Sequence, residues 1–169
     1  MENEHSAAMG VRKSMAVGWG AVIGAGVIAS VVFQVLEVLL IPLVGGGSPW
    51  GPARMIAAMV MGPGVLPPPA TFDPTIVGVA LVVDVVLAIA YTAILSFVIR
   101  GWPLGRAVLA GAGFGVALYA INFYGFTAVF PWFEMGRNGV TLFTHIVFSV
   151  TAVMAYKNLH GRSTLARRA

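Results

Sequence analysis

The chain has 169 residues, of which 59% are apolar and only 9% carry a charge. A soluble domain covers its surface with about 25% charged residues, so this composition excludes a disordered chain and an ordinary soluble enzyme. The net charge is +4, and because the chain has no Cys it is not a disulfide-stapled secreted module either. The composition predicts an all-α, polytopic membrane protein whose main partner is the lipid bilayer.

Four stretches are apolar over the roughly 20 residues needed to cross a bilayer. We place the spans at 15–44, 74–99, 106–130 and 140–156. They predict a four-helix bundle, one membrane domain at 15–159 between an N-terminal tail at 1–14 and a basic tail at 160–169. The first stretch is longer than the apolar part of a signal peptide, so we interpret it as a true span.

Two span boundaries are marked by proline. Asp73 precedes Pro74 at the start of the second span. An Asp can cap free helix amides, and Pro fits the first helical position, so the two residues predict a helix start. The third span is expected to end at Phe130, because Pro131 cannot continue the amide ladder.

The Lys and Arg residues predict the orientation. Eight of them flank one side of the spans, namely Arg12, Lys13, Arg100, Arg106, Lys157, Arg162, Arg167 and Arg168. Only Arg54 and Arg137 lie on the other side. Because basic residues in short flanking segments stay cytoplasmic, we expect a multi-pass protein with both termini in the cytoplasm. The basic residues form no patch interleaved with aromatics, so no nucleic-acid partner is expected.

The first outer loop, 45–73, carries an apolar run between a Gly-rich and a Pro-rich segment. Pro52 can start a helix there and Gly62 can end it. Such a helix is too short to span a bilayer, so it would be interfacial or re-entrant. We interpret the loop as a structured lid, with a helix merely resting on the membrane surface as the alternative.

Two glycine motifs favour close helix packing. Gly20 and Gly24 lie in the first span, and Gly111 and Gly115 in the third. This GxxxG spacing lets helix backbones approach closely. We expect the two spans to pack on each other within the chain, with a homodimer seam as the alternative. In both spans an amide side chain follows the glycines, which suggests a parallel repeat of two hairpins.

Five polar side chains interrupt the spans: Gln34, Glu37, Asp84, Asn122 and His145. At 1.5 Å rise per residue, all five fall in the half of the membrane nearer the outer loops. Ionisable residues in hydrocarbon are costly and often mark ion or proton pathways. The sequence therefore predicts an outward-facing polar pocket that serves as an ion or proton site. The structural alternatives are interhelical hydrogen bonds and a buried Asp84–His145 pair.

Helical spacing places these residues on stripes. On the fourth span one face carries Thr141, His145, Ser149, Ala152 and Tyr156, and on the third span Gly111, Gly115, Leu118, Asn122 and Gly125. The pocket is expected where such stripes meet. Its lid and mouth are predicted at Trp50, Arg54, Trp132, Glu134 and Arg137.

Catalytic patterns are lacking in the sequence. It has no Cys, no HExxH motif and no phosphate-binding Gly-Lys-Ser/Thr loop. We therefore expect no cofactor and no bound metal, and an enzyme acting on lipid or quinone is our third interpretation of the function.

Two segments, 41–73 and 122–138, carry a resemblance. The first runs from Ile41-Pro42-Leu43-Val44-Gly45-Gly46-Gly47-Ser48-Pro49-Trp50 to Leu66-Pro67-Pro68-Pro69, and the second begins Asn122-Phe123-Tyr124-Gly125. They resemble a family of small, uncharacterised four-span bacterial inner-membrane proteins. The resemblance implies a bacterial source and this topology, and it brings no activity. Some relatives carry sodium:proline symporter labels, but that symporter fold needs far more spans than this length provides.

The sequence leaves two main functional interpretations open. The first is a self-associating bundle that binds or transports a small ion, a proton or a solute through the outward-facing pocket, with a homodimer as the expected form for transport. The alternative is a non-catalytic accessory subunit or assembly factor of a larger membrane complex, with the outer loops docking the partner.

Overall fold

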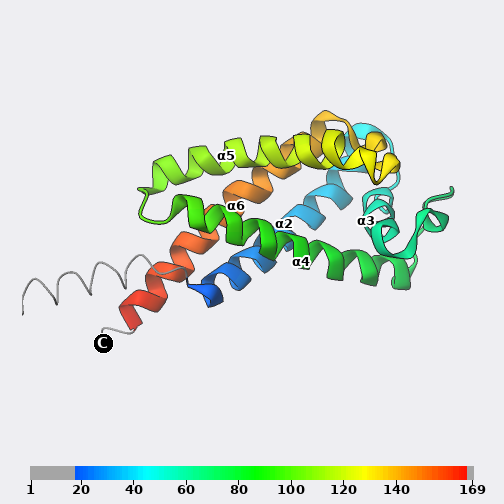
Figure 1. Ribbon diagram of the computed structural model, residues 1–169. Helices are drawn as coiled ribbons and strands as arrows, with labels where there is room; N and C mark the ends of the chain where they lie inside the picture. The colour runs from blue at the N-terminus through cyan, green and yellow to red at the C-terminus, as the bar shows by residue number, and fades with distance from the viewer. Residues whose placement is uncertain (1–17, 167–169) are drawn as a thin grey trace, which may run out of the picture.

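The computed structural model describes residues 18–166 and is all-helical over that range (Figure 1). Its α-helices are α2 (Trp19–Gly45), α3 (Gly51–Met61), α4 (Pro74–Ile99), α5 (Leu104–Ala120) and α6 (Gly139–Ala166). Short helical turns are η1 (Pro63–Val65), η2 (Ile121–Gly125), η3 (Phe126–Ala128) and η4 (Pro131–Gly136). Within this range four helical segments are long and apolar enough to cross a membrane, namely α2, α4, Leu104–Ala128 and Gly139–Arg162. The predicted all-α four-helix membrane bundle is confirmed.

Local chemistry sets the helix ends. Asp73 caps α4 as predicted, because its carboxylate accepts from the backbone amides of Thr75 at 2.8 Å and Ile76 at 3.0 Å. Gly46 ends α2 in the left-handed conformation, with φ 65°, which a residue without Cβ adopts at no steric cost. Asn138 caps α6, since its side-chain oxygen accepts from the Thr141 amide at 2.9 Å.

The regular α-helix of the third span ends earlier than the position of Pro131 predicted. Regular α-helix stops at Ala120, and the π-helical turn η2 follows. A π turn holds one extra residue, which rotates the following side chains about the helix axis. As a result Phe123 is buried and Gly125 is exposed, so the stripe predicted through Gly125 is wrong beyond Asn122.

The fourth span is longer than predicted. α6 continues to Ala166, beyond the expected end at Tyr156. No proline interrupts this segment, and residues such as Lys157 and Leu159 are good helix formers. The helix therefore continues into the stretch predicted as a basic tail, whose residues 167–169 lie outside the described range. The predicted N-terminal tail, 1–14, and the first residues of the predicted first span, 15–17, also lie outside that range.

Helix α6 is the centre of the bundle, with its largest interfaces against α2 and α5. A Cβ added at Gly111 would lie 2.7 Å from Val153, and one at Gly115 would lie 2.6 Å from the backbone oxygen of His145. The glycines of α5 therefore serve the α5–α6 interface. The prediction that the two glycine-rich spans pack on each other was wrong. Both α2 and α5 pack on α6 instead, and α6 carries small residues of its own. Gly24 approaches Leu159 of α6, and a Cβ at Gly20 would meet nothing within 4 Å among the described residues.

Helix α4 packs on α2 and on α3 and makes few contacts with α5. A Cβ at Gly26 of α2 would lie 2.8 Å from the Ile89 Cα of α4, so these two helices also approach closely. Ala57 of α3 packs with Ile76 and Ala80 of α4. The short helix predicted after Pro52 is thus present and ends at Gly62, and it packs on the bundle itself.

The two ends of the bundle differ. In Figure 1 the start of α2, the end of α6 and the α4–α5 turn lie at one end, and α3 lies at the opposite end. We call the latter the capped end, formed by α3, η1 and η4. The helices of each hairpin, α2 with α4 and α5 with α6, pack on each other, but their repeat relationship stays a prediction.

Candidate functional site

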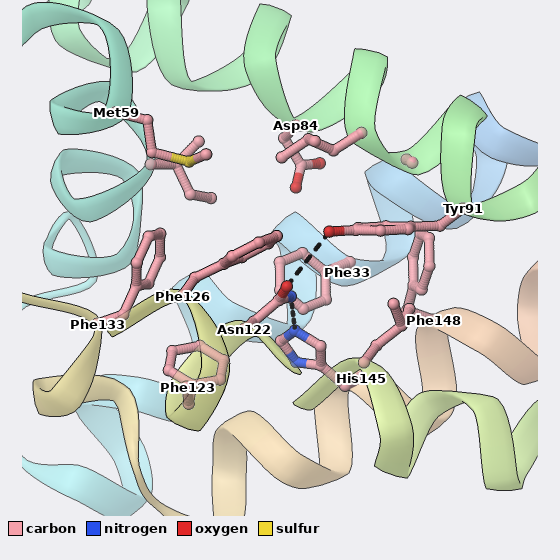
Figure 2. Close-up of a pocket in the computed structure, with 14 residues that line it drawn as sticks. Phe33, Met59, Asp84, Tyr91, Asn122, Phe123, Phe126, Phe133, His145 and Phe148 are labelled. Atoms are coloured by element: carbon pink, nitrogen blue, oxygen red, sulfur yellow. Dashed lines mark hydrogen bonds between the residues drawn. The ribbon is translucent and has the colours of Figure 1, made fainter. Parts of the chain in front are cut away.

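A cavity of about 80 Å³ lies between α4 and α5, below α3. We call it the chamber, and Figure 2 shows the side chains that surround it. Its lining comprises Phe33, Ile56, Met59, Asp84, Leu87, Ala88, Tyr91, Leu118, Asn122, Phe123, Phe126, Phe133, His145 and Phe148. Most of these side chains are apolar, so the pocket is less polar than the sequence suggested. The reason is that several of the polar side chains on the stripes bind one another.

A chain of hydrogen bonds runs along one wall of the chamber (Figure 2). The Tyr91 hydroxyl donates to the Asn122 side-chain oxygen at 3.2 Å. The Asn122 amide group lies 3.2 Å from His145 Nε2, and His145 Nδ1 lies 2.8 Å from the Thr141 carbonyl oxygen. Because a carbonyl only accepts, Nδ1 carries the proton and Nε2 accepts from Asn122. This pattern describes a neutral imidazole held in one tautomer.

Asp84 approaches the chamber from α4. Its Oδ2 accepts from the Ser30 hydroxyl of α2 at 2.6 Å, and Figure 2 shows the carboxylate directed into the space between Met59 and Tyr91. Asp84 and His145 form no direct ion pair in the described part of the chain, so the structure does not show the buried Asp84–His145 pair that the sequence left open as an alternative. Asp84 instead accepts a hydrogen bond from Ser30, and His145 is bonded to Asn122 and to the Thr141 carbonyl.

The other two predicted pocket residues lie outside the chamber. Glu37 is 2% exposed and accepts from the Thr144 hydroxyl of α6 at 2.5 Å. Gln34 lines a small separate pocket beside Trp50 and makes no hydrogen bond within the described residues. The structure therefore brings together Asp84, Asn122 and His145 around the chamber, and it leaves Gln34 and Glu37 of α2 outside the chamber lining.

Arg54 of α3 fixes the lid to the rest of the first outer loop. Its Nη1 donates to the Val65 carbonyl at 2.7 Å, and its Nε and Nη2 donate to the Thr71 carbonyl at 3.2 and 3.0 Å. Trp132 of η4 donates from Nε1 to the Met55 carbonyl at 3.0 Å. These bonds join both outer loops into one cap, and Ile56 and Met59 of α3 face the chamber.

The remaining predicted mouth residues also lie at the capped end. Arg137 pairs with Glu134 at 2.6 Å, and its Nε donates to the carbonyl of Phe123 at 2.7 Å. This second bond ties the loop before α6 to the π-helical turn that carries Asn122. Trp50 packs edge to face on Phe72, with ring centroids 4.9 Å apart. All five mouth residues thus hold the cap together.

A second and larger cavity, about 990 Å³, lies below α3 between the capped ends of α2 and α6. We call it the vestibule. Glu37 and Arg54 are among the residues that line it. Four apolar side chains line both the vestibule and the chamber, namely Phe33, Ile56, Phe123 and Phe133. They form the wall between the two cavities.

Sequence reasoning missed the aromatic lining. Five phenylalanines face the chamber, from α2, α6 and the turns after α5: Phe33, Phe123, Phe126, Phe133 and Phe148. The spacing of Phe123, Phe126 and Phe133 around Pro131 was the available signal. Thr144 was missed too, although it is adjacent to His145 in the sequence.

The chamber offers groups for binding more than for chemistry. No cluster of three His, Asp or Glu side chains that would hold a metal occurs among residues 18–166. No protein-family model, no curated protein and no solved structure matches the chain. The function must therefore be argued from the geometry alone.

Proposed function

We propose that this is a multi-pass protein of a bacterial inner membrane, a member of the four-span family that it resembles, with both termini cytoplasmic. The distribution of basic residues supports this orientation. Arg54 and Arg137 belong to the capped end, which would face outward. Lys157 belongs to the opposite end, where its Nζ donates to the carbonyls of Ile99 and Trp102.

We propose further that the chamber binds a small solute within the membrane domain. The observation that carries this proposal is the Asp84 carboxylate, directed into a largely apolar cavity beside a fixed Tyr91–Asn122–His145 wall. Ligand sites typically combine apolar lining with a few well-placed polar groups. The phenylalanine-rich lining favours a solute over a hydrated inorganic ion, since it offers few oxygen ligands to replace bound water.

A native mass spectrum tests this function. The protein is extracted gently from its own membranes, and we expect a bound small molecule. Leu87 lines the chamber, so Leu87→Trp should fill it and remove the extra mass. The control is Val86→Trp on the same helix, at a position that is 61% exposed and outside the chamber lining. This variant should keep the bound molecule.

Two results would count against solute binding. One is a wild-type spectrum without any small molecule. The other is a co-purifying protein that both tryptophan variants retain, which would favour the accessory-subunit alternative, with the capped end as the docking surface.

A further inference from the structure

We infer that the ligand of the chamber is a small organic cation whose alkylated ammonium group is held by the Asp84 carboxylate and the surrounding phenyl rings. This inference rests on the proposed solute binding and names the class of solute.

The charges around Asp84 favour a cationic ligand. Ser30 supplies one hydrogen bond, and no cationic side chain of residues 18–162 forms an ion pair with the carboxylate. Arg54 binds carbonyls of the cap, and Lys157 binds carbonyls at the opposite end of the bundle. His145 is neutral in the hydrogen-bond pattern described above. A carboxylate inside a membrane is costly without a counter-charge, and a cationic ligand would supply it.

The aromatic lining of the chamber also favours a cation. Phenyl rings attract cations through their negatively polarised faces, over distances up to about 6 Å from the ring centroid. The rings of Phe33 and Phe123 are held in place by edge-to-face contacts with the His145 ring, at centroid distances of 5.1 and 5.4 Å. In Figure 2 Phe126 and Phe133 lie between Met59 and Phe123. The neutral imidazole thus orients the rings without repelling a cation.

The small number of oxygen ligands in the chamber favours an organic cation over an inorganic one. Inorganic cations such as Ca²⁺ and Mg²⁺ take about six or more oxygen ligands. The side-chain oxygens among the chamber residues belong to Asp84, Tyr91 and Asn122, which are too few for such a shell. A quaternary ammonium group needs no such oxygen shell and fits an aromatic cage with one carboxylate.

Choline and its neutral carbon analogue, 3,3-dimethylbutan-1-ol, provide a matched pair of probes. They have nearly the same shape and differ in charge. Binding is measured by isothermal titration calorimetry with the full chain in dodecyl maltoside micelles. We expect wild-type protein to bind choline at least about tenfold more tightly than the neutral alcohol, a ratio that corresponds to ~1.4 kcal/mol.

Two carboxylate variants locate the effect. Asp84→Asn should abolish the preference for choline and leave binding of the neutral alcohol largely unchanged. Glu37→Gln removes a membrane-embedded carboxyl that lies outside the chamber, so it should keep the preference. If Asp84→Asn fails to fold, Phe126→Leu serves instead, at a residue that is 38% exposed. It should weaken choline binding by about threefold and affect the alcohol less.

The outcomes separate the two proposals. Equal binding of the two probes to the wild type, or an unchanged preference in Asp84→Asn, would refute the cation inference and leave solute binding standing. Saturable binding of neither probe would refute both proposals for a ligand of this size. A preference that disappears equally in Glu37→Gln would refute Asp84 as the specific anchor.

Discussion

The close approach of α5 to α6 leads to a stability prediction for Gly115→Ala. A Cβ at this position would lie 2.6 Å from both the His145 carbonyl oxygen and the Ile146 Cα, whereas ordinary contact begins at 3.4 Å. Both neighbours are backbone atoms of α6 and cannot rotate away, so the helices must separate. Overpacking of this kind costs about 1–3 kcal/mol, and alanine's better helix propensity returns up to about 1 kcal/mol. With the full propensity gain subtracted, we expect a net loss of up to about 2 kcal/mol in the free energy of unfolding.

Gly113→Ala is the matched control on the same helix. Its added Cβ would meet nothing within 4 Å in the described structure, so only the propensity gain of up to about 1 kcal/mol remains. Both variants are unfolded by titrating SDS into dodecyl maltoside micelles, with helicity followed by circular dichroism. The order of stability should be Gly113→Ala, wild type, Gly115→Ala.

Gly115→Ala should also weaken ligand binding in the chamber. Gly115 contacts the backbone of His145, and His145 binds Asn122 of the adjoining π-helical turn. Separating α5 from α6 should therefore lengthen this hydrogen bond and weaken binding in the chamber. Equal stability of Gly115→Ala and Gly113→Ala would refute the close α5–α6 contact and the reasoning built on it.

Three further predictions concern orientation, the cap and the hydrogen-bonded wall. The chain has no Cys of its own, so single cysteines can be introduced for labelling. A Cys at Gly62 should react with an impermeant maleimide from outside, and a Cys at Gly101 should react only after permeabilisation. Labelling at position 101 in intact cells would refute the topology. Arg54→Ala removes three hydrogen bonds to loop carbonyls, so limited proteolysis of the first outer loop should accelerate several-fold while membrane insertion is unchanged; wild-type cleavage rates would show that the cap does not depend on them. Asn122→Leu leaves the His145 ring nitrogen without its donor and should cost about 1 kcal/mol in SDS unfolding; no loss would count against the bonded wall.

The sequence predicted those features that follow from local chemistry. The start of α4 was readable because Asp73 and Pro74 each have one well-defined use at a helix start. The α6 stripe was readable because helical spacing places Thr141, His145 and Ser149 on one face, and all three are buried. Span length gave the number of crossing segments.

What the sequence did not predict depends on tertiary contacts. The π-helical turn begins where Asn122 is bound by Tyr91 and His145 from two other helices, and no local pattern revealed it. The partner of the glycine motif was also unreadable, since close approach requires small residues on the other helix as well as on α5. The aromatic chamber arises because the turns after α5 fold Phe126 and Phe133 back over the bundle.

The unequal helix contacts have a mechanical consequence. α5 packs closely on α6 through Gly111 and Gly115, and α4 packs closely on α2 at Gly26, whereas α4 and α5 share few contacts. Along the α4–α5 seam the chamber takes the place of side-chain packing. Deformation concentrates where contacts are fewest, so the α4–α5 seam is the compliant part of the bundle. A ligand larger than the cavity would therefore be accommodated by a widening of the α4–α5 seam, while the Asn122–His145 hydrogen bond, which joins the end of α5 to α6, stays in place.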